Sequence, residues 1–469
     1  MTPPPAPTAA PAENRTVFGR LDPARLLPVA WPVYIELMSG VIAGIISVVW
    51  IARLGASALA TVTMASTLEN VLTSVVLAVS GGTTILLSQA VGANDHARLR
   101  PVLRAAFRLT LLVTVVICAV LFVLREPLAK LILGSDEHDA VGLSVDYLTV
   151  TVPGIAVFYG QYLVDSTFKA NGDTRTPMRM ALLSNLILVV ADPVLIYGWL
   201  GAPKLGVTGS ALALVGSRAV TLAVTWWLYR RSALAAQLAA APETATESPG
   251  KGPVREILAA GLPLGVDFLV RMAAGMLIVG VVARFGTDQV AAYGTVTRTL
   301  LFLTMAAYAM RQAATIIAAR AKGADDEELL AASRTSSVRL GIAWSLLGGL
   351  AVLTLGGLAA DAVTGDAAVR SAAHGQVPWL AVYITLLLCN VTLSGIFLGG
   401  GHGKALATST TAGAVLQLVL APLLALTPLG LTGAWIAMIV NAGTQTTVLL
   451  VLATRQMSAP KLEAKEVAA

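Results

Sequence analysis

The chain has 469 residues, of which 56% are hydrophobic and only 12% are charged, and its mean hydropathy is +0.77. Because a soluble protein carries about 25% charged residues, this composition excludes a soluble domain and predicts a protein embedded in a lipid bilayer. The net charge of +6 does not indicate a nucleic-acid partner, since excess Lys and Arg in a membrane protein mark cytoplasmic loops.

Apolar residues occur in runs of about 20, the length that crosses ~30 Å of hydrocarbon. We predict twelve transmembrane helices, at residues 27–51, 60–89, 105–125, 146–168, 178–199, 206–230, 257–283, 290–318, 337–357, 377–399, 406–427 and 430–454. An even number of spans places both termini on one side of the membrane. Lys and Arg concentrate in the tails and loops of that side, which predicts that both termini are cytoplasmic. The expected location is the inner (plasma) membrane.

A polar stretch at 231–256, rich in Pro, Gly, Ser and Thr, predicts a cytoplasmic linker between two lobes of six helices each, 27–230 and 257–455. The Pro- and Ala-rich segment 1–26 is predicted to be a disordered cytoplasmic tail. The segment 456–469 is predicted to be a second cytoplasmic tail, disordered over its last residues, KLEAKEVAA at 461–469. The expected fold is therefore an all-α polytopic membrane protein with a parallel internal repeat, acting as a monomer.

The two predicted lobes share matching sequence. ARLG at 52–55 returns as ARFG at 283–286, and the same offset of 231 residues places Glu36 onto Asp267, each four positions after a proline. Duplicated bundles with acidic residues inside the membrane are typical of secondary transporters. The AspPro pair that contains Asp192 returns only as AlaPro, so this acid has no counterpart in the second lobe.

Several motifs in the chain resemble the multidrug and toxic compound extrusion (MATE) family, and its bacterial DinF-like branch in particular. The motifs are KANGDTRTPM at 169–178, AspPro at 192–193, ARLGASALA at 52–60 and ARFGTDQVAAY at 283–293. The resemblance implies a two-lobed antiporter that exports small organic, often cationic or amphipathic compounds by alternating access, driven by inward flux of protons or sodium ions. It implies no enzymatic activity and no cofactor.

The motif match carries over Asp192 as the acid of the fifth helix, whereas other family positions differ. Ser47 stands where DinF-like members have an aspartate, Leu188 where the family has an asparagine, and Arg271 where other branches have a glutamate. Both protons and sodium ions remain candidate coupling ions. We favour protons, because a lone carboxylate needs fewer fixed ligands to bind a proton than to bind sodium.

Charged and polar side chains inside the predicted spans are the candidate ion-coupling residues, since a charge at the bilayer centre costs about 2.5–3.5 kcal/mol. Asp192 is the predicted coupling carboxylate. Glu36 is a candidate second proton carrier, with packing or gating as its alternative role. Asn185, two helical turns before Asp192, is the candidate polar neighbour.

Other charges inside the spans predict ion pairs or gates. Asp267 and Arg271 are four residues apart on one helix, so they are expected to pair. Glu36 is expected to pair with Arg271 when the cytoplasmic ends of the lobes meet. Glu69 is expected to pair with Arg298 in the opposite state.

Two further charged sites complete this set. Arg218 is a candidate charge partner for acids of the first lobe. Asp165 and Lys169, four residues apart near the cytoplasmic end of the fourth span, are expected to form a structural ion pair.

Aromatic and methionine side chains in the spans are candidates for a substrate cavity, because ring faces attract organic cations and methionines adapt to varied ligands. The candidates are Tyr34, Met38, Tyr162, Phe268, Met272 and Tyr293. Ordinary packing is the alternative role of each. Three arginines inside the second lobe keep open an alternative function, that of a flippase for lipid-linked oligosaccharides or other lipids. None of the four histidines lies deep in a span, which disfavours an intramembrane enzyme.

Overall fold

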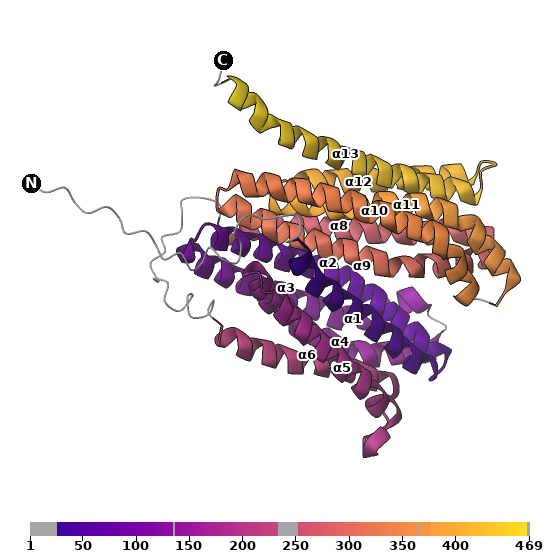
Figure 1. The fold of residues 1–469 in the computed structure, drawn as a ribbon. Coiled ribbons are helices and arrows are strands. Elements are labelled where there is room, and N and C mark those ends of the chain that lie inside the picture. Colours follow the sequence, from indigo (N-terminus) through magenta and orange to yellow (C-terminus); the bar gives the residue numbers. More distant parts are fainter. Residues whose placement is uncertain (1–25, 135–136, 233–251, 364, 467–469) are drawn as a thin grey trace, which may run out of the picture.

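The computed structural model describes residues 26–134, 137–232, 252–363 and 365–466 (Figure 1). Within these residues the secondary structure is helical, and twelve helices are long and apolar enough to cross a membrane. The helices are α1 (Leu26–Ala52), α2 (Ala56–Gly92), α3 (His96–Leu133), α4 (His138–Ala170), α5 (Arg175–Tyr197), α6 (Gly206–Arg230), α8 (Pro253–Val282), α9 (Thr287–Gly323), α10 (Glu327–Val363), α11 (Ala367–Gly399), α12 (Gly403–Ala425) and α13 (Leu431–Glu466), with short 3-10 turns at η3 (Trp199–Gly201) and η4 (Ala283–Phe285).

The twelve predicted spans correspond to these twelve helices, so the predicted fold class is confirmed. Several helices extend beyond their apolar core, and α2 reaches 37 residues. The disorder predicted for 461–469 does not hold up to Glu466, because α13 continues as a helix to that residue. This segment is rich in Ala, Lys and Glu, which favour helix even outside a membrane. The predicted tail 1–26 (except Leu26) and most of the predicted linker 231–256 lie outside the described residues.

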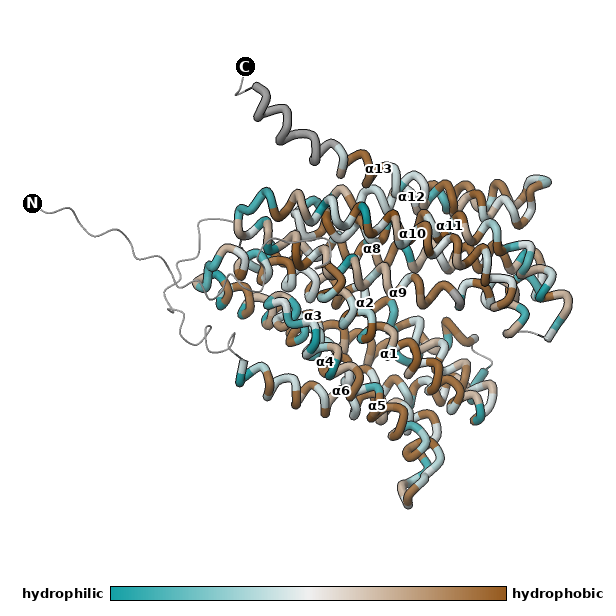
Figure 2. The backbone as a smooth tube through the Cα atoms, in the orientation of Figure 1, coloured by the Kyte–Doolittle hydropathy of each residue, from teal (hydrophilic) through white to brown (hydrophobic). Residues whose placement is uncertain are grey.

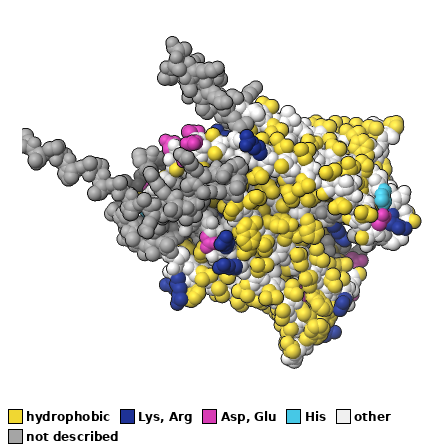
Figure 3. Space-filling view, viewed as in Figure 1, with side chains coloured by type: hydrophobic (Ala, Val, Ile, Leu, Met, Phe, Trp, Pro, Cys, Tyr) yellow, Lys and Arg dark blue, Asp and Glu magenta, His cyan; other side chains and the backbone are white. Residues whose placement is uncertain are grey.

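The helices form two groups that follow the chain. Helices α1 to α6 form the first lobe, and α8 to α13 form the second (Figure 1). Hydrophobic residues dominate the middle of most helices and hydrophilic residues cluster toward their ends (Figure 2). On the face drawn in Figure 3, a broad hydrophobic belt separates the charged side chains of the two ends, as expected for a protein surrounded by lipid.

We call the end at which α1 and α8 begin the tail end, and the opposite end the far end. The lobes meet through α1 and α2 of the first lobe and α8 and α9 of the second. Their closest approach lies near the tail end, where α2 crosses α8. A Cβ atom on Gly261 would lie 1.7 Å from the carbonyl oxygen of Ala78, and one on Gly82 would lie 2.1 Å from that of Ile257. Only glycine permits two helices to pack this closely.

A second close contact between the lobes follows the internal repeat. A Cβ on Gly92 would lie 2.2 Å from the carbonyl oxygen of Arg320, and one on Gly323 would lie 2.0 Å from that of Gln89. Gly92 and Gln89 map onto Gly323 and Arg320 by the same 231-residue offset that relates the two lobes. The contact is therefore nearly two-fold symmetric, which is what a parallel repeat around a central axis produces.

Polar contacts reinforce the tail-end closure. Arg98 on α3 forms an ion pair with Glu256 on α8, with the two side chains 2.6 Å apart. The guanidinium of Arg320 donates to the backbone carbonyl of Ala170 at 2.6 Å. Figure 1 shows the ribbons of the two lobes diverging toward the far end. The lobes are thus closed against each other at the tail end.

Adding a side chain to Gly261 tests this closure. We expect Gly261→Val to force α8 away from α2, because overpacking a close contact costs about 1–3 kcal/mol. The measurement is cross-linking by a short bifunctional maleimide between cysteines placed at Arg98 and Glu256, in a background where Cys118 and Cys389 are serine. The cross-linking yield should fall.

The matched control is Gly275→Val on the same helix, where a Cβ meets no atom within 4 Å. Its cross-linking yield should equal that of the parent. Equal yields in both variants would show that the glycine contact does not hold the tail end closed.

Candidate functional site

Asp192 lies on α5 inside the first lobe and is completely buried, with 0% of its surface exposed. The hydroxyl of Ser47 on α1 donates a hydrogen bond to its Oδ2 atom. The hydroxyl of Ser210, buried on α6, lies near the same carboxyl group. The Oδ1 atom is also buried, and neither a hydrogen-bond donor nor a basic side chain pairs with it among the described residues.

Close helix packing places these groups together. A Cβ on Gly209 would lie 2.4 Å from the carbonyl oxygen of Leu195, so this glycine allows α6 to lie directly against α5. The next residue, Ser210, consequently reaches the Asp192 carboxyl. Apolar side chains that include Ala43 and Leu188 pack nearby and separate the carboxyl from water.

Asn185 belongs to a different part of the lobe. Its side-chain amide donates to the hydroxyl of Ser39 at 2.8 Å, and that hydroxyl donates to the backbone carbonyl of Glu36 at 2.8 Å. Seven residues separate Asn185 from Asp192, or about 10 Å along the helix. The predicted ion-coupling set is therefore divided: Asn185 and Glu36 are linked to each other through Ser39, whereas Asp192 is bound by serines.

Glu36 pairs with Lys169 of α4, with Nζ and Oε1 2.8 Å apart and side-chain exposures of 17% and 8%. Two predictions are corrected by this contact. Glu36 does not pair with Arg271 although the tail end is closed, and Asp165 does not pair with Lys169. Asp165 instead accepts a hydrogen bond from Gln161 at 2.8 Å. The long lysine side chain reaches across to α1, a contact between helices that spacing along one helix cannot reveal.

In the second lobe, Asp267 is fully buried and bound on several sides. Arg271 approaches Oδ1 at 3.0 Å, as predicted from their spacing, and Thr410 donates to the same oxygen at 2.7 Å. Arg311 of α9 forms a second ion pair, 2.7 Å from Oδ2. The sequence pattern did not predict this last ion pair, because Arg311 lies 44 residues from Asp267 along the chain.

Arg271 extends the network through uncharged amides. It donates to Asn390 at 2.5 Å and to Gln445 at 3.3 Å. Gln445 donates in turn to Asn441 at 2.5 Å, and Asn441 donates to Gln417. These amides were not among the predicted site residues, because in the second lobe only charged, aromatic and methionine side chains were candidates. A search for Asn and Gln in apolar segments would have found them.

A cavity of about 270 Å³ lies between the lobes, on the far-end side of the closed tail end. Helices α1, α2 and α4 line it from the first lobe, and α8, α9 and α11 from the second. Its polar and aromatic lining residues include Glu36, Tyr162, Asp165, Lys169, Phe268, Tyr308, Arg311 and Gln312.

Only two of the six predicted substrate-cavity residues line this cavity, namely Tyr162 and Phe268. Met38 is buried within α1 packing, at 7% exposure. Tyr293 packs against Trp435 in the core of the second lobe, with ring centres 5.7 Å apart. Tyr34 and Met272 are half-buried and do not line the cavity. For Met38 and Tyr293, ordinary packing is the observed role in this conformation.

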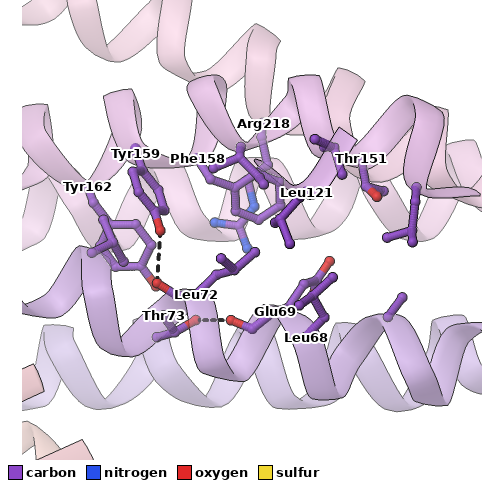
Figure 4. Close-up of a pocket in the computed structure, with 15 residues that line it drawn as sticks. Leu68, Glu69, Leu72, Thr73, Leu121, Thr151, Phe158, Tyr159, Tyr162 and Arg218 are labelled. Atoms are coloured by element: carbon purple, nitrogen blue, oxygen red, sulfur yellow. Dashed lines mark hydrogen bonds between the residues drawn. The ribbon is translucent and has the colours of Figure 1, made fainter. Parts of the chain in front are cut away.

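A smaller pocket of about 190 Å³ lies within the first lobe (Figure 4). Glu69 and Arg218 both line it, and the Arg218 guanidinium lies over the ring of Phe158 at 5.1 Å. Arg298 is exposed on α9. The predicted Glu69–Arg298 pair is absent here, but it was assigned to the state with an open tail end and stays a prediction for that state.

Comparison with known families identifies this architecture. The MatE family model matches residues 32–194 and 263–423, the equivalent part of each lobe. The chain belongs to the MatE family. This confirms the resemblance inferred from the motifs, and it makes the protein a multi-pass membrane transporter rather than an enzyme.

Among curated MatE relatives, the probable multidrug resistance protein YoeA of Bacillus subtilis is 26% identical over 304 residues, covering 64% of each chain. This match spans slightly less than two thirds of that relative. The probable multidrug resistance protein NorM of Thermotoga maritima is 23% identical over 375 residues, covering 78% of each chain.

Solved structures of MatE-like transporters share the fold. A MOP superfamily transporter from Pyrococcus furiosus superposes with a TM-score of 0.84 at 21% identity, covering 94% of this chain and 97% of that chain. A multidrug resistance MATE family transporter in an outward-facing conformation gives a TM-score of 0.83 at 21% identity, with the same coverage. At this identity the likeness establishes the fold alone.

The Glu36–Lys169 ion pair gives a stability prediction. Lys169→Met should leave a buried carboxylate without its base and lower the free energy of unfolding by about 3 kcal/mol. The double variant Glu36→Gln, Lys169→Met should recover most of this loss, because it removes both charges. Equilibrium unfolding in mixed micelles measures the difference.

The control is Lys130→Met, which removes the base of an exposed pair with Glu126 and should change stability little. If the single Lys169 variant were as stable as the double variant, the pair would not compensate the burial of Glu36.

Proposed function

We propose that this protein exports small organic, amphipathic compounds across the plasma membrane in exchange for inward-moving protons. Two curated relatives are named as probable multidrug resistance proteins, which supports the substrate class. The observation that carries the coupling is the environment of Asp192.

Asp192 and Asp267 are both fully buried acids, but only Asp267 has basic partners. A buried carboxylate without a base is strongly destabilised, so such a group takes up a cation or becomes neutral by binding a proton. In Asp192 one oxygen accepts from Ser47 and the other has no partner among the described residues. A proton on the carboxyl would remove the unpaired charge.

Sodium fits this site less well than a proton does. Hard cations in proteins are held by several oxygen ligands at once. Around Asp192 the described side chains supply only the carboxyl and the hydroxyls of Ser47 and Ser210. Asn185, the predicted additional ligand, is bound to Ser39 instead. A proton requires none of these ligands.

We infer that the tail end faces the cytoplasm, because Lys and Arg concentrate in the loops on that side. With the tail end closed, we assign the structure to an outward-facing state of the proposed transport cycle. Ionised Asp192 ties α1 to α5 through Ser47, and α1 also carries Glu36 into the central cavity. Protonation of Asp192 weakens that tie and so favours rearrangement of α1 and opening of the tail end.

Removing the carboxyl tests the proposal. Asp192→Asn should reduce proton-driven efflux to the level of vesicles without the protein, because the amide keeps the size and most hydrogen bonds but cannot exchange a proton. The measurement is uptake of a fluorescent organic cation into inverted vesicles with an imposed pH gradient.

Asp139→Asn is the matched control, since it makes the same chemical change at an exposed position in the first turn of α4. This variant should transport normally. Normal gradient-dependent transport by Asp192→Asn would exclude Asp192 from the coupling mechanism.

The choice of ion gives a separate prediction. In proteoliposomes, an imposed pH gradient at equal sodium concentration should drive efflux, and an imposed sodium gradient at constant pH should not. Efflux that follows the sodium gradient alone would assign coupling to sodium and overturn this part of the proposal.

A further inference from the structure

The central cavity has walls of opposite charge. The wall from the first lobe carries the acids Glu36 and Asp165 with a single base, Lys169. The wall from the second lobe presents Arg311, whose partner Asp267 is shared with Arg271. Counted as ionised groups, the first wall has one excess negative charge and the second has one excess positive charge.

Arg311 retains hydrogen-bonding capacity on the positive wall. It is 5% exposed, and its Nη1 atom pairs with Asp267 at 2.7 Å. Its Nε and Nη2 atoms are buried and have no hydrogen-bond partner among the described residues. Buried guanidinium donors are costly to leave unpaired, and they match the geometry of a carboxylate.

The backbone holds Arg311 firmly at this position. A Cβ on Gly395 of α11 would lie 2.2 Å from the carbonyl oxygen of Arg311, so α9 and α11 are in direct contact there. Thr315, one turn further along α9, donates to the carbonyl of Gly395 at 3.1 Å. The guanidinium is thus presented from a rigid helix pair, which is the preorganisation that a recognition group requires.

On the opposite wall Asp165 is the acid best placed to receive a cation. Its carboxyl accepts a hydrogen bond from Gln161 but forms no ion pair within the described residues, whereas Glu36 is already paired with Lys169. Aromatic rings of Tyr162, Phe268 and Tyr308 line the space between the two walls. Rings of this kind favour flat, aromatic ligands.

We propose that the central cavity binds amphipathic aromatic zwitterions, with Arg311 receiving the carboxylate of the ligand and Asp165 its cationic group. This inference rests on the proposed export function, whose substrate it specifies. A bound zwitterion gives each of the two charged walls a group of opposite charge. A purely cationic ligand can pair only with the negative wall.

The test compares two dyes that differ only at the carboxyl group. Rhodamine 110 carries a free carboxylate and a cationic ring system, and rhodamine 123 is its methyl ester and a simple cation. Binding to the purified protein in detergent is followed by fluorescence anisotropy, so the result does not depend on transport. The readout is the affinity for rhodamine 110 divided by the affinity for rhodamine 123.

In Arg311→Gln this ratio should fall about tenfold, the loss expected for a hydrogen bond to a charged group. Arg311→Lys keeps the charge beside Asp267 but lacks the paired donors, so its ratio should lie between those of the parent and Arg311→Gln. The Arg311→Lys variant also provides the test if Arg311→Gln does not fold. Asp165→Asn should weaken binding of both dyes. Arg339→Gln, which changes an exposed arginine outside the cavity lining, should leave the ratio unchanged.

An unchanged ratio in folded Arg311 variants would overturn the proposal, as would a parent protein that binds neither dye. Vesicle efflux of rhodamine 123 tests the export function separately. Absent efflux with an Arg311-dependent binding ratio would contradict export but retain the recognition site. Gradient-driven efflux with an Arg311-independent ratio would contradict the recognition site alone.

Discussion

A charge buried inside a membrane protein must be compensated, and the way each charge is compensated determines how this molecule is organised. Asp267 is neutralised by two arginines and Glu36 by one lysine. Asp192 is buried as completely as Asp267 but has only serine hydroxyls beside it. One lobe therefore contains a buried acid that forms no ion pair among the described residues, and the other contains a buried acid whose charge is balanced within a polar network. For this reason the proposed coupling is assigned to the first lobe.

The internal repeat provides contacts that suit the proposed movement of the two lobes around such a site. Equivalent glycines at the ends of α2 and α9 pack reciprocally, and additional glycines let α2 cross α8 closely. These glycine contacts need no charged side chain, so breaking them does not in itself leave an ion unpaired. The two exposed partners Arg98 and Glu256 lie at the rim of the closure, where water can solvate them after separation.

Much of the fold follows from the sequence, because the length and spacing of apolar segments are constrained by bilayer thickness. Spacing along one helix also predicted the contact of Asp267 with Arg271. Contacts between helices could not be predicted in this way. Lys169 pairs with Glu36 instead of its neighbour Asp165, and Arg311 reaches Asp267 from another helix. Side-chain direction, which spacing does not determine, also explains why Tyr293 and Met38 face cores while Tyr162 and Phe268 face the cavity.

The protonation state of Asp192 is the most direct test of the central claim, and infrared difference spectroscopy of the purified transporter measures it. A protonated carboxyl in an apolar site gives a C=O stretching band that disappears when the group ionises. We predict a band of this kind that titrates with pH, is absent in Asp192→Asn and persists in Asp267→Asn. Sodium at constant pH should leave it unchanged. A spectrum in which Asp192→Asn removes no titrating band, or in which sodium removes the band at constant pH, would contradict proton binding at Asp192.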